Sequence, residues 1–316
     1  MLKTKLGNIE LNSCIYNASG VYCKTYDELM NLNNSSSVCI VLCKSCTVEP
    51  REGNPLPIYW DNKDTMSINS SGLPNLGYKF YINENIVNSI TKPYIISISG
   101  LCENDNLEIV TRVTETPNIS GIELNLSCPN VIGKSQIGYD FEAMDELLKK
   151  VENIILIRKF MDKNFIYGLK LPPYFDISHF EKVASIINKY SIDTITCINS
   201  LGNGLVVDPN TDTTVIKPKG GFGGIGGSVI KPIALANVHK FSELTNCDII
   251  GCGGIRTGRD IYEHILCGAK AVQVGTQFYM ENISVFDRLE RELKDILIEK
   301  GYSSIEDLRG KLKTLN

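Results

Sequence analysis

The stretch Gly121-Ile-Glu-Leu-Asn-Leu-Ser-Cys-Pro-Asn130 combines the pattern of a β-strand with an abrupt polar ending. Apolar residues alternate with Glu123 and Asn125, which is the period of two that a strand requires. Pro129 cannot continue a sheet ladder, so the strand must end before it. Cys128 therefore falls on a loop at the carboxyl end of a strand. In proteins that alternate strands with helices, catalytic groups gather at that edge, and we interpret Cys128 as a candidate active-site residue.

Eight runs of this kind, each ending in small or polar residues, read as short strands. Helix-like stretches with apolar residues at three- and four-residue spacing lie between most of them, as at residues 141–151 and 258–266. Strands that alternate with helices pair in parallel, and eight of them close a barrel. We therefore predict a single (β/α)8 TIM-barrel domain over residues 1–316. The strands are expected at residues 14–18, 38–43, 94–98, 121–126, 166–171, 194–198, 248–252 and 271–275.

Two connections are too long for simple crossovers. Residues 44–78 contain two strand-like runs around Asp61-Asn-Lys-Asp64, and residues 199–227 contain two more around Pro209-Asn-Thr-Asp212. Both tetrapeptides have turn chemistry, so each connection is expected to form a β-hairpin. We predict that both are insertions above the C-terminal face of the barrel, where such segments make a substrate lid or a subunit contact.

The composition points to a small-molecule partner and away from nucleic acid and membranes. The chain has 316 residues, 43% of them hydrophobic, and its formal net charge of -4 leaves no basic surplus. No apolar run approaches the ~20 residues that span a bilayer, and the first residues lack a signal-peptide core. The 11 cysteines are dispersed, unlike a secreted disulfide framework. A cytoplasmic protein with reduced thiols is expected.

If the eight strands close, the residues that follow them share one rim. Lys44 and Lys170 stand at two different strand ends, where they would meet a ligand with anionic or carbonyl edges. Glycines in Gly251-Cys-Gly-Gly-Ile255 and Val274-Gly-Thr276 follow the last two strands, the usual phosphate site of such barrels. Gly221-Phe-Gly-Gly-Ile-Gly226 matches a dinucleotide fingerprint without following the first strand, so we interpret it as a glycine loop leading to the same phosphate. The other rim residues are Ser19, Gly20, Ser45, Ser99, Gly100, Asn125, Ser127, Asn199 and Ser200.

Other chemistries on this scaffold fit the sequence less well. Cys39, Cys43 and Cys46 have the spacing of an iron–sulfur ligand set, but Cys39 lies inside an apolar run and cannot wrap a cluster from a loop. The three histidines fall in helix-like stretches, which disfavours zinc or a histidine base. A lone cysteine is more often a small buried hydrophobe than an acid or nucleophile. Cys128 and the two lysines are nevertheless the titratable groups expected on the rim.

Four motifs resemble those of the dihydroorotate dehydrogenases, and the likeness covers essentially the whole chain. They are Asn125-Leu-Ser-Cys-Pro-Asn130, Ser67-Ile-Asn-Ser-Ser-Gly-Leu-Pro-Asn75, Phe222-Gly-Gly-Ile-Gly-Gly227 and Gly251-Cys-Gly-Gly-Ile255. Cysteine stands where the membrane-bound, quinone-linked class has serine, so the sequence is similar to the soluble class. Gly72-Leu-Pro-Asn75 and Cys128-Pro-Asn-Val-Ile-Gly-Lys-Ser-Gln136 resemble the fumarate-linked homodimers (class 1A). The NAD-linked type, with an iron–sulfur partner subunit, is the alternative.

The resemblance implies oxidation of dihydroorotate to orotate in de novo pyrimidine (UMP) biosynthesis, with fumarate reduced to succinate. It places flavin mononucleotide (FMN) across the barrel mouth and makes Cys128 the general base for the C5 proton of the substrate, with Lys44 and Lys170 beside it, while the C6 hydride passes to the flavin. The implied FMN contacts are Ala18, Gly20, Lys44, Ser45, Asn125, Lys170, Ile198, Gly227, Gly253, Gly254, Gly275 and Thr276. The implied substrate contacts are Lys44, Asn69, Ser70, Ser71, Gly72, Leu73, Asn125, Asn130, Asn199 and Ser200.

Two positions depart from the family pattern. Ser71 stands where methionine is expected beside the substrate, and Ile132 where proline is expected in the cysteine loop; neither change removes a chemical group. A flavin-dependent tRNA dihydrouridine synthase is an alternative on the same scaffold, but it would show a basic RNA-binding surface. A flavin-binding protein without turnover is a non-enzymatic alternative, which Cys128 and the two lysines disfavour.

Overall fold

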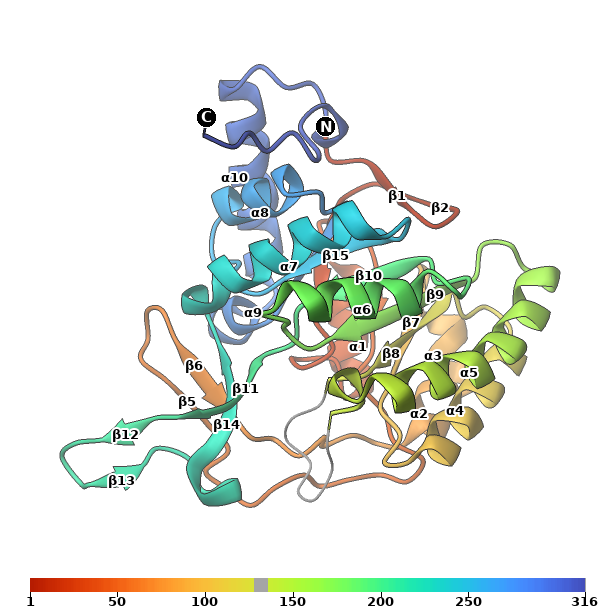
Figure 1. Cartoon of the computed structure of the whole chain (residues 1–316), viewed down its shortest axis with the longest axis horizontal. Coiled ribbons are helices and arrows are strands. Elements are labelled where there is room, and N and C mark those ends of the chain that lie inside the picture. Colours follow the sequence, from red (N-terminus) through yellow and green to blue (C-terminus); the bar gives the residue numbers. More distant parts are fainter. Residues whose placement is uncertain (128–135, 316) are drawn as a thin grey trace.

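Eight parallel strands form the central sheet of the protein (Figure 1). The computed structural model describes residues 1–127 and 136–315. The strands follow one another in space as β3 (Ile15–Asn17), β16 (Ala271–Val274), β15 (Asp248–Cys252), β10 (Thr194–Cys197), β9 (Ile166–Leu171), β8 (Gly121–Asn125), β7 (Tyr94–Ile98) and β4 (Val41–Leu42). The predicted TIM barrel is confirmed.

A side chain closes the barrel between β3 and β4. Asn17 Nδ2 donates to Leu42 O at 2.7 Å, and the Leu42 N–H donates to Asn17 Oδ1 at 3.1 Å. One backbone bond, from Cys39 N to Ile15 O at 3.0 Å, lies on the same seam. β4 has a regular ladder with β7 over only 2 residues, so the strand predicted at residues 38–43 is shorter than expected.

The strands are apolar because both of their faces are covered. Every residue of β7 and β9 is buried, including those that point into the barrel and those that point toward the helices. A parallel sheet enclosed in this way requires nearly continuous apolar runs, which is the pattern seen in the sequence. Glu123 and Gln273 are buried polar residues inside the barrel strands, so they depart from the apolar pattern and their hydrogen bonds require an explanation.

Helices cover the outside of the barrel (Figure 1). Threonines start two of them, because Thr25 and Thr257 form capping boxes with Glu28 and Asp260. The long helices are α1 (Tyr26–Asn34), α4 (Glu103–Glu115), α5 (Phe141–Met161), α6 (Ile177–Ile187), α7 (Lys231–Leu244), α8 (Gly258–Leu266) and α10 (Ser284–Glu299). The shorter ones are α2 (Tyr78–Tyr81), α3 (Glu84–Ser89) and α9 (Thr276–Glu281), with 3-10 turns at Ile137–Tyr139, Pro218–Gly221, Ser228–Ile230 and Ile305–Asp307. Among the described residues, no helix is long and apolar enough to cross a membrane.

The two insertions join in one antiparallel sheet, which the sequence did not predict. This insertion sheet has the order β11-β14-β6-β5, with β5 (Tyr59–Asp61) and β6 (Ser67–Asn69) from the first insertion and β11 (Leu201–Leu205) and β14 (Phe222–Gly226) from the second. The second insertion also carries the predicted hairpin, as β12 (Val207–Asp208) and β13 (Thr213–Thr214). Figure 1 shows the insertion sheet and this hairpin to one side of the barrel.

The segment interpreted as a glycine loop at residues 221–226 is mostly a strand, β14, so the expectation of a loop was wrong. That the segment leads to a phosphate stays a prediction. Its glycines serve close packing between the two insertions: a Cβ at Gly223 would lie 2.6 Å from Asn69 O. The glycines therefore allow β14 to pair with β6.

An unpredicted N-terminal hairpin lies at the other end of the barrel. β1 (Thr4–Leu6) pairs with β2 (Ile9–Leu11), and the Gly7 N–H donates to Asp248 Oδ2 at 2.9 Å. Asp248 is the first residue of β15, so the hairpin contacts the edge where the parallel strands begin. The edge where the strands end, under the insertion sheet, stays available for a ligand.

Candidate active site

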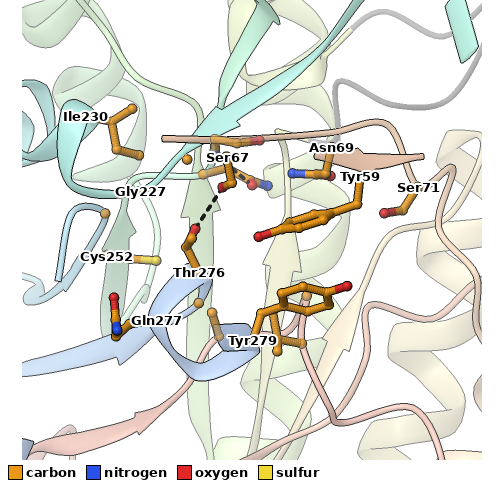
Figure 2. Close-up of a pocket in the computed structure, with 18 of the residues that line it drawn as sticks. Tyr59, Ser67, Asn69, Ser71, Gly227, Ile230, Cys252, Thr276, Gln277 and Tyr279 are labelled. Atoms are coloured by element: carbon orange, nitrogen blue, oxygen red, sulfur yellow. Dashed lines mark hydrogen bonds between the residues drawn. The ribbon is translucent and has the colours of Figure 1, made fainter. Parts of the chain in front are cut away.

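A cavity of about 640 Å³ opens at the C-terminal ends of the barrel strands. Strand-end residues such as Ala18, Lys170 and Cys252 line it on one side, and insertion residues such as Tyr59 and Ser67 line it on the other. Figure 2 shows side chains of β5 and β6 facing those of α9 across this space. The volume lies within the range of small-molecule sites, and the C-terminal face of a TIM barrel is where active sites occur.

The structure brings most of the predicted site residues to this cavity. All of the predicted FMN contacts line it, and so do the predicted substrate contacts Lys44, Asn69, Ser71, Gly72, Leu73, Asn125, Asn199 and Ser200. Ser70 is fully buried, is not among the lining residues, and its Oγ has no hydrogen-bond partner among the described residues. Cys128, Asn130 and Ile132 lie outside the described residues.

Two lysines bring positive charge to the cavity from different strands. Lys170 is 3% exposed in β9, and its Nζ donates to Gln273 Oε1 at 2.5 Å and to Cys252 Sγ at 3.2 Å. Lys44 follows β4, is partly exposed, and its Nζ donates to Gly20 O at 3.4 Å. Lys170 is therefore held by the barrel interior, whereas the Lys44 side chain has room to adjust to a ligand.

Amide and hydroxyl side chains form one hydrogen-bonded group beside the lysines. Asn125 Nδ2 donates to Ser45 Oγ at 3.2 Å, and Ser127 Oγ donates to Asn125 Oδ1 at 3.0 Å. Asn199 Nδ2 donates to Ser127 Oγ at 2.9 Å and lies 3.3 Å from Asn125 Oδ1. Because an amide offers both donors and an acceptor, this group suits the imide edge of a small ring.

Glycines make the backbone turns at one end of the cavity, which we call the glycine end (Gly227, Gly253, Gly254 and Gly275). Gly227 and Gly254 have φ of 89° and 77°, in the left-handed region. A Cβ at Gly254 would lie 2.3 Å from the Lys231 side chain, so no larger residue fits there. Ser67 and Thr276 lie beside these turns with their hydroxyl oxygens 3.1 Å apart (Figure 2). Glycine turns next to the first N–H groups of helices are typical phosphate sites.

A buried histidine supports the glycine end from behind. His264 Nε2 lies 3.0 Å from Gly253 O, and because a carbonyl only accepts, Nε2 carries the hydrogen. His264 Nδ1 has no hydrogen-bond partner within the described residues. Burial lowers the pKa of His264 to about 4, so the imidazole is neutral near pH 7.

Two tyrosines that sequence reasoning missed, Tyr59 and Tyr279, line the cavity at α9. The ring centres of Tyr59 and Tyr279 are 4.2 Å apart, and Tyr22 stacks on Tyr279 at 5.8 Å. Figure 2 shows the rings of Tyr59 and Tyr279 one above the other. Burial raises the pKa of Tyr59, so its hydroxyl stays protonated near neutral pH. Nothing in the sequence distinguished these tyrosines from ordinary strand and helix residues.

Sequence reasoning also missed three polar residues of the cavity, Gln273, Arg256 and Cys252. For two of them the sequence carries a feature that could have indicated the site. Gln273 is a polar residue inside an apolar strand, and Arg256 follows the glycine turn after β15. Arg256 Nη1 pairs with Asp64 Oδ1 at 2.5 Å, which joins the β5–β6 turn to that loop. Cys252, the last residue of β15, gave no such signal.

Neither the rival cysteines nor the histidines are among the residues that line the cavity. Cys39, Cys43 and Cys46 are buried and none of them lines it. Across residues 1–127 and 136–315, no group of three or more His, Cys, Asp or Glu side chains is arranged to hold a metal ion.

The cavity lies at the C-terminal face of a TIM barrel and is lined by two lysines, several amides and the glycine end. This position and lining are typical of the active site of a TIM-barrel enzyme. A sequence profile described as dihydroorotate dehydrogenase matches residues 1–297, and the chain belongs to this family of oxidoreductases.

Curated relatives agree with that assignment, and a solved structure agrees with the fold. A Lactococcus lactis protein named "Dihydroorotate dehydrogenase A (fumarate)" is 47% identical over 322 residues, covering 100% of both chains. A Streptococcus agalactiae protein is 48% identical over 319 residues, covering 99% of both chains. A crystal structure of DHODH from Eimeria tenella in complex with ferulenol superposes with a TM-score of 0.81 at 21% identity, covering 98% of this chain and 88% of that one, and it supports the fold.

Proposed function

We propose that this chain oxidises dihydroorotate to orotate with FMN bound in the cavity, and that fumarate takes the electrons and becomes succinate. One observation carries the proposal: in a chain of this family, a single cavity joins a glycine end to a group of lysines and asparagines. The fumarate-linked name of the Lactococcus lactis relative supports fumarate as the acceptor. Orotate formation would serve pyrimidine biosynthesis.

The residues present fit FMN. The glycine end and Thr276 suit the phosphate, because small residues let backbone N–H groups approach it closely. Gly20 lines the cavity, and a Cβ there would meet nothing within 4 Å, which leaves open space for a ring system. Lys170 and Asn125 offer donors to the polar edge of that ring. These residues would hold FMN, which would supply the acceptor for the hydride of the substrate.

The remaining lining residues fit dihydroorotate and orotate. Both molecules carry a carboxylate and an imide edge, so a cation and amide groups are required to hold them. Lys44 supplies an adjustable cation, and Asn69 and Asn199 supply amides from opposite insertions. Together these groups would fix the orientation of the substrate in the cavity.

We assign the general base to Cys128 on the family resemblance, and the described residues that flank its segment are held by hydrogen bonds. On one side, Ser127 is buried and hydrogen bonded to Asn125 and Asn199. On the other side, the Gly138 N–H donates to Leu126 O at 2.8 Å, and Tyr174 OH donates to Gly138 O at 2.5 Å. Ser127 and Gly138, the described residues, are thus both held near the end of β8. The Cys128 thiolate would take the C5 proton.

We also propose a homodimer. Leu205, Val207 and Phe222 on the insertion sheet and its hairpin are 48%, 55% and 43% exposed, which is unusual for apolar residues gathered on one segment. A second copy would cover them. Light scattering should give twice the chain mass, and Phe222→Glu should shift the protein toward monomer; a parent protein of single-chain mass would refute the dimer.

The flavin assignment is tested on Gly20. The purified protein should release FMN on denaturation, identified by chromatography against FMN and FAD. Gly20→Ala should bind FMN more weakly and Gly20→Leu should bind almost none, because each side chain grows into the cavity. Both variants should unfold at the parent's denaturant midpoint when flavin-free, since a Cβ at this position contacts nothing. A parent protein without flavin, or a Gly20→Leu variant with full flavin content, would refute the proposed cofactor site.

A further inference from the structure

Polar side chains from six barrel strands form a hydrogen-bonded layer inside the barrel, which we call the interior layer. Each member is at most 8% exposed, although strands buried on both faces are otherwise apolar. Lys170, Cys252 and Gln273 also line the cavity, whereas the other members lie beneath it. The layer consists of Tyr16 (β3), Glu123 (β8), Lys170 (β9), Thr196 (β10), Cys252 (β15) and Gln273 (β16).

Gln273 is the centre of the interior layer. Its Oε1 accepts from Lys170 Nζ at 2.5 Å, and its Nε2 donates to Glu123 Oε2 at 2.5 Å and to Tyr16 OH at 3.2 Å. An ammonium group only donates and a carboxylate only accepts, so the orientation of the Gln273 amide is determined by its partners. A hydrocarbon side chain at position 273 would leave Lys170 and Glu123 each without its hydrogen bond to Gln273.

The two charged members of the layer are connected through Gln273 and not to each other. Within the described residues, Glu123 Oε2 accepts from Gln273 and from Thr196 Oγ1 at 2.8 Å, Glu123 Oε1 has no hydrogen-bond partner, and Glu123 makes no ion pair. Lys170 Nζ donates to Gln273 and Cys252, which leaves one of its three N–H groups for a ligand in the cavity. Buried charges persist only where hydrogen bonds and opposite charge compensate for lost hydration.

We propose that Gln273 and Glu123 are positioning residues that hold the Lys170 ammonium at the cavity and thereby set the reduction potential of the bound flavin. This inference rests on the proposed function, because it requires a flavin next to Lys170. The Lys170 cation favours the negative charge that hydride transfer brings into the cavity, and the Glu123 carboxylate beneath it opposes that charge. Gln273 determines how far these two opposite effects cancel, because it holds the Lys170 cation at the cavity and above the Glu123 carboxylate.

The two residues therefore have opposite expected effects. Gln273→Leu removes the bond that holds Lys170 at the cavity, so the cation is lost or drawn down to Glu123, and the potential should fall. Glu123→Gln removes the opposing charge and keeps the side-chain shape, so the potential should rise. We expect at least a tenfold change in the equilibrium constant of flavin reduction in each direction, which is about 30 mV for a two-electron couple.

The experiment is an anaerobic spectroelectrochemical titration of the FMN-loaded protein and its variants. Val272→Ala is the matched control, because Val272 is a buried neighbour on β16 whose side chain points to the opposite face of the strand. It should lower the denaturant midpoint and leave the flavin potential at the parent value. If Gln273→Leu does not fold, the near-isosteric Glu123→Gln still tests the inference.

Potentials that stay at the parent value in Gln273→Leu and Glu123→Gln, or that move in the same direction, would overturn the inference and leave the interior layer a purely structural feature. Failure of the proposed function has a different signature. A flavin that binds but is not reduced by dihydroorotate would refute the substrate, while the electrochemical potentials would still decide the role of Gln273. A parent protein that binds no flavin would refute both.

Discussion

The side-chain amide of Asn17 exchanges two hydrogen bonds with the backbone of Leu42, at 2.7 and 3.1 Å. These bonds replace the missing ladder between the first and second barrel strands. Asn17 directly precedes Ala18, and Leu42 lies two residues before Lys44, so the same seam fixes two edges of the cavity. The Asn17 side chain thus contributes both to barrel closure and to the geometry of the cavity edge.

Asn17→Ala should destabilise the protein by roughly 2–6 kcal/mol. The substitution removes two hydrogen bonds and leaves the buried N–H and C=O of Leu42 without partners, each of which costs about 1–3 kcal/mol. Urea unfolding of the flavin-free protein measures the effect. Asn104→Ala, at an exposed position of α4, is the control and should change stability by no more than about 0.5 kcal/mol. Equal stability of the two variants would show that the seam closes without Asn17.

His264 should make folding stability fall in mild acid. Burial is the main cause that lowers its pKa from 6.5 to about 4, while Asp260 and Glu263 oppose the shift and Lys231 adds to it. Between those pH values the unfolded chain binds a proton that the folded protein does not. The neutral His264 therefore makes its full contribution to the free energy of unfolding above pH 6.5. That contribution, on the order of 3 kcal/mol, is lost as the pH falls toward 4.

His264→Gln isolates this contribution, because glutamine keeps a donor for Gly253 O and does not titrate. The parent protein should lose stability relative to His264→Gln as the pH falls from 6.5 to 4. Urea unfolding at several pH values gives the comparison. A difference between the two proteins that does not change with pH would contradict the assignment.

The ion pair between Asp64 and Arg256 should slow the release of FMN. Both residues line the cavity, and their side chains are 65% and 45% exposed. Exposed pairs contribute about 0.2–1 kcal/mol, so Asp64→Ala should release FMN roughly 1.5 to 5 times faster at low salt, with little difference at 1 M salt. Glu103→Ala, which breaks a pair with Lys150 outside the cavity, is the control and should not alter release. Equal release rates for the two variants would remove the Asp64–Arg256 pair from cofactor retention.

Cys128 should give the reductive reaction its pH dependence. A free cysteine has a pKa of about 8.5, and only the thiolate accepts a proton, so flavin reduction by dihydroorotate should speed up as the pH rises toward that value. Cys128→Ala should keep FMN bound and slow its reduction by orders of magnitude, as measured by stopped-flow absorbance. Unchanged reduction in Cys128→Ala would remove Cys128 from the mechanism.

The barrel could be predicted from the sequence because each strand is a short apolar run with its own ending signal. Hairpins in the insertions were predictable for the same reason, since Asp61-Asn-Lys-Asp64 and Pro209-Asn-Thr-Asp212 are local turn signals. The pairing of β6 with β14 was not predictable. It joins residues more than 150 positions apart in the chain, and no local sequence pattern specifies which residues pair. The glycine loop at residues 221–226 was predicted wrongly for the same reason, because nothing in that segment indicates that it pairs with β6.

The candidate site divides in a similar way. Residues just past the strand ends, such as Lys44 and Gly253, could be expected at the cavity once the strands were known. Tyr59 and Tyr279 reach it through the insertion sheet and α9, whose positions follow from tertiary packing. The role of Gln273 as a bridge between Lys170 and Glu123 depends on distances across the barrel, which a linear sequence does not contain.

The most direct measurement is an anaerobic one on the purified flavin-loaded protein. Dihydroorotate is added and the flavin absorbance is followed, and fumarate or NAD is then added to separate samples. The proposed function predicts bleaching by dihydroorotate and recovery with fumarate alone. Recovery only with NAD and an added iron–sulfur subunit would contradict fumarate as the acceptor, and absence of bleaching would contradict dihydroorotate as the substrate.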